Sequence, residues 1–492
     1  MKRYFKQSIL MLAALAGIIG CGHKDPEFAD LTKQEKEQRQ AINLFAYNTM
    51  STYYLWSADI TSELSDWKMF GDPVEKVKKA RYKDSSGKDI DKWTVLTEDI
   101  ESMKSSTAGV STTYGMDFKL YWYDESQTAV CMVITVVYPD SPAEKAGLKR
   151  GDVIMKIAGK GMTGENYSSL LYDSFLNAKS CTVTDRNSKE YKMTAVEMYE
   201  NPVLVRKVFD VGGKKVGYLF FNSFTLAACQ DLIEAGKYFR SEGIESLILD
   251  MRYNGGGFVV TETVLASMLA PEAEVKAGSV FETVVYNSTL TEAWGKDDTC
   301  FSENITYNYS GKDYSLDLSG ANFGISHLYA IMTGDSASAS ESLLVGLMPY
   351  MDVKIFGQQS YGKYCSGIMY SAKDWYKDYD EVLDEDQRKL GKQYAAKWGI
   401  YVMVGRYADK DGNTPCMPDG FKPDYVVEDS PVEPYQLGDE REAMLAAVLA
   451  RLGGGETTPT AAGRSAAAPA RALGPEIARD RGPAYGAHVI LR

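Results

Sequence analysis

Histidine and positive charge are both scarce in this sequence of 492 residues, and each shortage narrows the possible functions. Only three histidines are present, so few positions can supply an imidazole as a catalytic base. Acidic residues outnumber lysine and arginine by 67 to 54, which gives a net charge of −13. A chain without surplus cations cannot neutralise many phosphates. We therefore expect no nucleic acid among its main partners.

Several short binding motifs are absent or incomplete. The seven cysteines form no C-x-x-C pair, so the usual zinc and redox motifs are missing. The acidic run at 373–389 lacks EF-hand spacing, and we expect a solvated insertion there. The stretch NGGG at 254–257 lacks the GxGxxG dinucleotide pattern. The stretch GQQSYGK at 357–363 has the spacing of a phosphate-binding loop, but Tyr364 stands where such a loop needs Ser or Thr. The sequence predicts no metal and no cofactor.

The first 20 residues have the pattern of a signal peptide. Three basic residues precede the apolar run SILMLAALAGII at 8–19, which is too short to span a bilayer comfortably. Gly20 and Cys21 then resemble the lipobox of bacterial lipoproteins, in which the cysteine is lipidated and becomes the mature N-terminus. We expect a cell-envelope protein, anchored by lipid to a membrane on its periplasmic or surface face, with residues 21–32 as a tether. An ordinary secretory signal with an incidental cysteine is the alternative.

The other six cysteines are compatible with disulfides in an oxidising envelope, but we expect most of them to be buried thiols.

The remaining patterns predict a multidomain α/β protein, since a chain of this length exceeds one hydrophobic core. Residues 33–105 show the periodicity of helices, and residues 106–200 contain short β-rich runs. Residues 201–452 alternate strand and helix patterns, which is typical of an α/β domain with a largely parallel sheet. Residues 453–492 are rich in Ala, Gly and Pro, and we expect a disordered tail. A frameshift or fusion scar would give the same composition.

The β-rich segment carries motifs that resemble a PDZ domain: SPA at 141–143, AGL at 146–148 and GDVI at 151–154. A PDZ domain adds an extended C-terminal peptide to a sheet edge and holds its carboxylate on backbone N–H groups. By this resemblance the peptide-binding loop comprises Tyr114, Gly115, Met116, Asp117 and Phe118, and a helix at 166–178 lines the groove. The implied partners are proteins or peptides with free C-termini. A purely structural β-domain is the alternative.

A serine cluster supplies candidates for a nucleophile. The stretch TGDSASASESLLVGLM at 333–348 follows an apolar strand and opens a helix, whose first N–H groups would favour a developing oxyanion. Ser336, Ser338 and Ser340 compete for this role. Helix capping is the competing interpretation, because Ser338 and Glu341 have the spacing of a capping box.

A serine hydroxyl needs a base to become a good nucleophile. His23 lies in the tether and His488 in the tail, and His327, just before the strand that leads to the serines, is not favoured. Lysine can serve as the base where burial lowers its pKa, because desolvation disfavours the ammonium ion. Lys363 follows the strand-like run VKIF and a glycine turn, which places it on a rigid element of the α/β domain.

Together these residues resemble the C-terminal processing (tail-specific) peptidases, Ser–Lys enzymes that carry a PDZ domain. In SASASE at 336–341 the central serine is Ser338, and Lys363 follows 25 residues later in a Gly-Lys pair. The stretches DMRYNGGG at 250–257 and PDGFKPDYVV at 418–427 also resemble the family. The resemblance implies Ser338 as nucleophile, Lys363 as general base, and an oxyanion hole from the amides of Gly256, or Gly257 next, with Ala339.

One departure from the family concerns the group that orients the lysine. The family's lysine is commonly followed by Gly-Thr-Val-Gln, and Gly367 stands in place of that Gln. Ser366 or a backbone carbonyl is left for this role, and nearby Asp352 is expected in an exposed turn.

The resemblance implies a serine endopeptidase that cleaves envelope proteins whose C-termini dock on the PDZ domain. A catalytically weak peptide-binding scaffold is the alternative.

Overall fold

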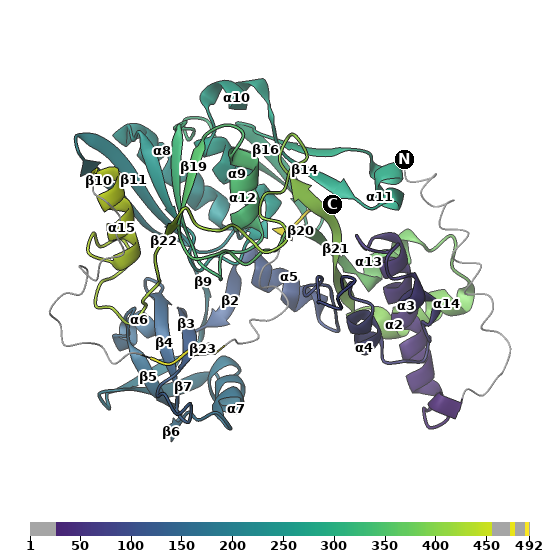
Figure 1. Ribbon diagram of the computed structural model, residues 1–492. Helices are drawn as coiled ribbons and strands as arrows, with labels where there is room; N and C mark the ends of the chain where they lie inside the picture. Colours follow the sequence, from purple (N-terminus) through teal and green to yellow (C-terminus); the bar gives the residue numbers. More distant parts are fainter. Residues whose placement is uncertain (1–25, 455–472, 478–487, 492) are drawn as a thin grey trace.

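The computed structural model of the chain describes residues 26–454, 473–477 and 488–491 (Figure 1). Cys21 and the apolar run before it lie outside these residues, so the signal peptide and the lipid anchor stay predictions from sequence. Across the three described ranges, no helix is long and apolar enough to cross a membrane.

The first folded unit is mainly helical, as its periodicity predicts. Helix α2 (Lys33–Thr52) begins at a capping box, in which Thr32 and Glu35 exchange hydrogen bonds between side chain and backbone. Its apolar face buries Ile42, Phe45 and Met50. The other elements of this unit are η2 (Pro26–Phe28), α3 (Thr61–Ser65), α4 (Pro73–Lys79), β1 (Val95–Thr97) and α5 (Ile100–Ala108).

The acidic run at 373–389 packs against this helical unit, so the expected solvated insertion is wrong. The run folds into α13 (Ala372–Asp378) and α14 (Glu385–Leu390), and the π-helical turn η4 (Gly391–Ala395) follows. Trp375 and Tyr376 are buried, and the Trp375 ring lies edge-on to Phe45 of α2 with 6.0 Å between centroids. Aromatic side chains between the charges give the run a face that gains from burial.

The β-rich unit has its own core beneath an antiparallel sheet. The strand order is β23-β3-β4-β5-β7-β8, with β6 beside β5, and Phe118, Ile134 and Phe175 lie in the core. A separate ribbon of β2 and β9 joins the two ends of the unit. Its elements are β2 (Val110–Thr113), β3 (Met116–Trp122), β4 (Val130–Val137), α6 (Pro142–Ala146), β5 (Val153–Ile157), β6 (Lys160–Gly161), α7 (Tyr167–Leu171), η3 (Tyr172–Leu176), β7 (Ser180–Asp185), β8 (Glu190–Thr194), β9 (Val196–Tyr199) and β23 (Glu476–Ile477).

The α/β unit is built on a six-stranded sheet in the order β10-β11-β12-β18-β19-β22, in which only the β10–β11 hairpin is antiparallel. The predicted largely parallel sheet is therefore confirmed. Helices α8, α9 and α12 pack on one face and α15 on the other. The elements are β10 (Val203–Val211), β11 (Lys214–Phe221), α8 (Ala228–Glu242), β12 (Ser246–Asp250), α9 (Val259–Leu269), β18 (His327–Met332), α12 (Ala339–Leu347), β19 (Asp352–Gly357), β22 (Tyr425–Val426) and α15 (Ala443–Leu452). The loops after β12, β18 and β19 meet at one sheet edge because parallel strands end together.

A second sheet stands beside these loops, in the order β13-β24-β20-β21-β14-β15, with β1 paired to β21. Its remaining strands are β13 (Gly257–Phe258), β14 (Val280–Tyr286), β15 (Asp297–Cys300), β20 (Cys365–Ser371), β21 (Gly399–Ala408) and β24 (His488–Val489). Around it lie α10 (Glu272–Ala277), α11 (Ser288–Trp294) and the hairpin of β16 (Asn304–Tyr309) and β17 (Lys312–Asp317).

The prediction that all of 453–492 is disordered is wrong for residues 473–477 and 488–491. Strand β23 pairs with β3 of the β-rich unit, and β24 pairs with β13 and β20 of the second sheet. The amino-acid composition of 453–492 could not predict these strands, because their hydrogen-bond partners are backbone groups of strands far away in the sequence.

A buried network of charges joins the β-rich unit to the α/β sheet. Arg150 of the β-rich unit and Arg252, after β12, lie 3.1 and 3.3 Å from the same oxygen of Asp429. Both arginines also contact Glu442, and each of the four side chains is at most 3% exposed. Burial of charge costs several kcal/mol per ion unless the charges are paired. The two units are therefore held together by pairs that depend on one another.

Candidate active site

Ser338 stands out among the three clustered serines because its hydroxyl is uncommitted. Ser336 Oγ donates to the Met251 carbonyl at 2.8 Å, and Ser340 Oγ donates to the Asn254 carbonyl at 2.9 Å. Ser338 Oγ is buried and has no hydrogen-bond partner in the described part of the chain. Its φ of 63° is rare for a residue other than glycine. Such backbone strain costs about 1–3 kcal/mol and is concentrated at functional sites.

Lys363 lies in the loop between β19 and β20, and its side chain is fully buried. Its Nζ donates to the hydroxyl of Tyr401 at 3.0 Å. The Nζ also lies 5.3 Å from the ring centroid of Trp93, so the helical unit supplies one wall of this site. Burial lowers the pKa of Lys363 to about 7, against weaker opposing effects of Cys365, Asp91 and Glu341. A large fraction of this amine is therefore neutral at neutral pH.

Glu341 holds the loops of Ser338 and Lys363 together. One carboxylate oxygen, Oε2, accepts the backbone N–H of Ser338 at 3.0 Å and that of Lys363 at 2.9 Å. The other oxygen accepts from Ser360 Oγ at 2.5 Å and from the Gly362 N–H at 2.7 Å. Burial raises the pKa of Glu341 to about 7, although these four donors act in the opposite direction. One half of the expected capping box is thus formed by Glu341, and the same carboxylate also binds the lysine loop.

The candidate oxyanion amides differ in their availability. The Gly256 N–H donates to the side chain of Asn254 at 2.9 Å. Gly257 lies next to it in β13, and a Cβ there would come within 2.2 Å of the Phe224 carbonyl oxygen, so only glycine fits. Ala339 is the first residue of α12, and its N–H has no hydrogen-bond acceptor within the described ranges. Of these candidates, Ala339 offers a free N–H donor within the described ranges, whereas the Gly256 N–H is engaged and Gly257 pairs with His488 of β24.

His327 and Asp352 lie away from this site, at the opposite ends of their strands. They are the first residues of β18 and β19, their side chains are about half exposed, and they contact each other at 3.4 Å. The expected exposed position of Asp352 agrees with the structure, and His327 cannot reach the serine loop that follows the far end of β18.

Two stretches of the chain match known families. Residues 215–427 match the model of peptidase family S41, and residues 133–173 match the model of the PDZ domain. Residues 215–427 therefore form a peptidase S41 domain. Ser338, Glu341 and Lys363 all lie within the stretch that matches this family. The motifs SPA, AGL and GDVI at 141–154 lie within the PDZ match.

Relatives of this chain include a probable CtpA-like serine protease of Staphylococcus haemolyticus and a carboxyl-terminal-processing protease of Picosynechococcus, each 24% identical, over 365 and 363 residues. The alignments cover 73% and 72% of this chain, and 62% and 73% of the respective relatives. The chain thus spans less than two thirds of the Staphylococcus protein's length. A putative S41 protease from Bacteroides fragilis has the same fold, with a TM-score of 0.63 at 24% identity; the match covers 83% of this chain and 97% of that one.

The Tyr401 ring packs against Gly367, the residue that stands where the resemblance leads us to expect a Gln. A Cβ at Gly367 would lie 2.6 Å from the Tyr401 ring, so glycine there makes room for the phenol that binds Lys363. The sequence prediction named Ser366 or a carbonyl for this role. Instead, Ser366 Oγ lies 2.7 Å from Nδ1 of His488.

The predicted peptide-binding loop of the PDZ domain, Tyr114–Phe118, leads into β3 beneath η3. The rings of Tyr114 and Phe118 lie 5.0 and 5.7 Å from Phe175 of η3. Strand β3 also contacts the serine loop, because Lys119 Nζ lies 2.8 Å from Asp335 Oδ2, three residues before Ser338. Both side chains of this ion pair are nearly buried. The PDZ strand and the serine loop are therefore in direct contact.

Three parts of this site were missed from sequence: Trp93 and Tyr401, which contact Lys363, and Tyr407, whose hydroxyl donates to the Lys363 carbonyl. The only signal for the tyrosines was the apolar strand GIYVMVGRY at 399–407. Among the six cysteines in the described ranges, all are free thiols, and only Cys300 is exposed.

Proposed function

We propose that this S41 protein is a serine endopeptidase with Ser338 as nucleophile and Lys363 as general base. The observation that carries the proposal is the pairing of an uncommitted hydroxyl on a strained turn with a buried lysine whose pKa lies near neutrality. Capping alone would leave the Ser338 hydroxyl bonded to the helix, whereas it has no partner among the described residues. Perturbed pKa values of this kind are typical of catalytic groups.

The reaction follows from these positions. Neutral Lys363 takes the proton of Ser338 Oγ as that oxygen attacks a peptide carbonyl, and the amides of Gly257 and Ala339 hold the oxyanion. The lysinium then gives its proton to the leaving amine, which leaves an acyl-enzyme on Ser338. Lys363 next takes a proton from a water molecule as its oxygen attacks the acyl carbon, and it returns that proton to Ser338 Oγ as the ester bond breaks and the acid product leaves. Ser338 and Lys363 make no mutual hydrogen bond in the resting site, and such contacts often tighten only with substrate.

Tyr401 is a positioning residue in this mechanism. Its hydroxyl accepts a hydrogen bond from Lys363 Nζ, and it therefore fixes the amine without charging it. The PDZ domain would dock substrate C-termini at loop 114–118, and the predicted lipid anchor would confine the reaction to the cell envelope.

Cleavage of an unstructured protein by the purified chain tests the pair. Ser338→Ala and Lys363→Ala should each abolish cleavage, whereas Ser336→Ala and Ser340→Ala should keep much of it, because their hydroxyls bond backbone carbonyls. The kcat/KM of the wild type should rise with pH through about 7, as Lys363 loses its proton. Tyr401→Phe should lower kcat by about ten-fold or more and displace this pH profile.

Full cleavage by Lys363→Ala would refute the mechanism. A wild type that neither cleaves a range of proteins nor reacts at Ser338 with a fluorophosphonate would favour the scaffold alternative.

A further inference from the structure

Residues 488–491 lie as an extra strand between the two loops of the candidate site. Strand β24 runs parallel to β13, with His488 opposite Gly257 and Val489 opposite Phe258. On its other side Val489 pairs with Gly367 of β20, and the Ile490 N–H donates to the Gly367 carbonyl at 3.0 Å. Strand β13 contains a candidate oxyanion amide, and β20 begins two residues after Lys363. An extended substrate would need this same gap.

The backbone of His488 contacts the residue that positions the base. Its N–H donates to the Tyr401 hydroxyl at 3.0 Å, and that hydroxyl faces the His488 carbonyl at 3.3 Å. The Tyr401 hydroxyl oxygen also accepts a hydrogen bond from Lys363 Nζ. The backbone of His488 is therefore linked to the proposed general base through the Tyr401 hydroxyl.

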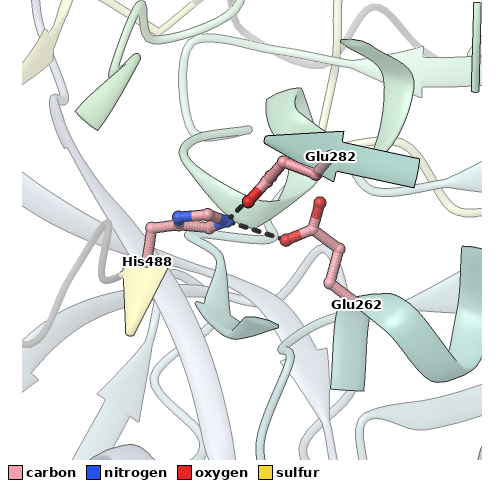
Figure 2. Close-up of side chains that lie close together, drawn as sticks. All are labelled: Glu262, Glu282 and His488. Carbon is pink, nitrogen blue, oxygen red and sulfur yellow. Dashed lines mark hydrogen bonds and ion pairs between the residues drawn. The ribbon is translucent and has the colours of Figure 1, made fainter. Parts of the chain in front are cut away.

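The His488 side chain fills a buried acidic pocket (Figure 2). Nε2 lies 2.8 Å from Glu262 and 3.6 Å from Glu282, while Nδ1 lies 2.7 Å from Ser366 Oγ. Each glutamate keeps one buried oxygen with no hydrogen-bond partner in the described part of the chain. Buried polar atoms are costly without partners, and here the imidazole hydrogen-bonds Glu262 while Ser342 Oγ donates to Glu282. The three ligand atoms lie close enough for a metal ion, but both ring nitrogens are already engaged by Ser366 and Glu262.

Residues 473–477 cover a second surface where a peptide would add. Strand β23 pairs antiparallel with β3 on the edge opposite β4, with Glu476 opposite Tyr121 and Ile477 opposite Leu120. The Gly474 N–H donates to the Trp122 carbonyl at 2.8 Å, and Glu476 lies 3.1 Å from Lys119 Nζ. Strand addition to this edge is how PDZ domains bind peptides.

We propose that residues 473–477 and 488–491 are an intramolecular ligand that occupies the PDZ edge and the catalytic gap and so competes with substrate. The proposal rests on the proposed peptidase function. Residues 473–477 add a strand to the PDZ edge, and residues 488–491 add a strand in the gap between β13 and β20. The second strand is anchored by the His488 side chain, which binds Ser366 and Glu262. A tethered competitor acts at an effective concentration of roughly millimolar. Substrates at lower concentration would therefore be excluded until the segment leaves.

A reversible cross-link tests the seating and the inhibition separately. Phe258 and Val489 are register partners and both are buried, and neighbouring strands stand at a separation that a disulfide spans. The double variant Phe258→Cys/Val489→Cys is made in the full chain with Cys300→Ser, which removes the exposed thiol. Oxidation should form the cross-link, as scored by mass spectrometry, and abolish both cleavage and fluorophosphonate labelling of Ser338. Reduction of the same sample should restore both.

Removal of the anchor gives an independent readout. His488→Ala should raise kcat/KM by about ten-fold, because the two hydrogen bonds of the imidazole, to Glu262 and Ser366, are lost from the seated state only. His327→Ala is the matched control at an exposed histidine and should leave kcat/KM unchanged.

The outcomes separate the two proposals. A cross-linked enzyme that cleaves as fast as its reduced form would overturn the inhibitory role, and failure of the cross-link to form in the folded chain would overturn the seating. If the cross-link forms but neither the reduced protein nor His488→Ala cleaves or labels, the peptidase function has failed and the inhibitory role falls with it, while the seating stands.

Discussion

Replacement of Lys363 by methionine should abolish catalysis and at the same time stabilise the fold. Methionine has a similar length and carries no charge into the buried site between Trp93 and Tyr401. The expected gain comes from the pKa of Lys363, which falls from 10.5 to about 7 because the ammonium loses its hydration. The folded protein thus binds this proton more weakly than the unfolded chain does.

The stabilisation by Lys363→Met should be larger at low pH than at high pH. Above about pH 10.5 the amine is neutral in both states and the lysine causes no electrostatic loss of stability. As pH falls from 10.5 to about 7 the unfolded chain takes up a proton that the folded site resists, and the loss grows to roughly 4–5 kcal/mol, after which it is constant. The variant also loses a hydrogen bond to Tyr401, which contributes about 1 kcal/mol. We expect a net stabilisation of about 3–4 kcal/mol at pH 6, which becomes small near pH 10.

Urea unfolding at pH 6, 7.5 and 9, followed by tryptophan fluorescence, measures this difference. The matched control is Lys354→Met, on the preceding strand, because Asp352 raises the pKa of Lys354 and its proton stays bound in this range. The lowered pKa of Lys363 would be refuted by a Lys363→Met variant that is no more stable than the wild type at pH 6. A difference in the free energy of unfolding that does not shrink with rising pH would also refute it.

Three further predictions follow from other parts of the molecule. Arg252→Met should leave Asp250 and Glu442 buried without the guanidinium group that binds both, and should reduce stability by about 3–5 kcal/mol. Arg441→Met, which removes an exposed ion pair, should change the urea midpoint little. Equal urea midpoints for the two variants would contradict the role of the buried network. Amidation of a substrate peptide's C-terminus should weaken its apparent affinity by about ten-fold to a hundred-fold, and an unchanged kcat/KM would show that the PDZ domain does not recognise C-termini. Labelled fatty acid should enter the wild type but not Cys21→Ser, which should be released in soluble form, and membrane retention of that variant would rule out the lipobox.

The sequence was most informative where chemistry and local structure require the same residues. The serine turn, the glycine turn and the Gly-Lys pair are short stretches, and their resemblance to the C-terminal processing peptidases singled out Ser338 and Lys363 as candidates. The largely parallel sheet was also predictable, because buried strands alternate with amphipathic helices along the chain. The structure added the reason for choosing Ser338, which is that Ser336 and Ser340 are bonded to backbone carbonyls.

Contacts between distant segments could not be predicted in this way. Tyr401 comes 38 residues after Lys363 on another strand, and no local pattern links them. The segment 488–491 was assigned to a disordered tail because its neighbours are rich in small residues, yet its order depends on edges supplied by β13 and β20. The acidic run at 373–389 was misjudged because charge was weighed above Trp375 and Tyr376.

The carboxylate of Glu341 has a consequence for how this site tolerates change. Because one oxygen holds the backbones of Ser338 and Lys363, the spacing of the proposed nucleophile and base is set over two hydrogen bonds and not over the 25 residues between them. We therefore expect changes of length or composition in strand β19, or in helix α12 beyond Glu341, to leave this spacing unchanged as long as the carboxylate keeps both backbone contacts.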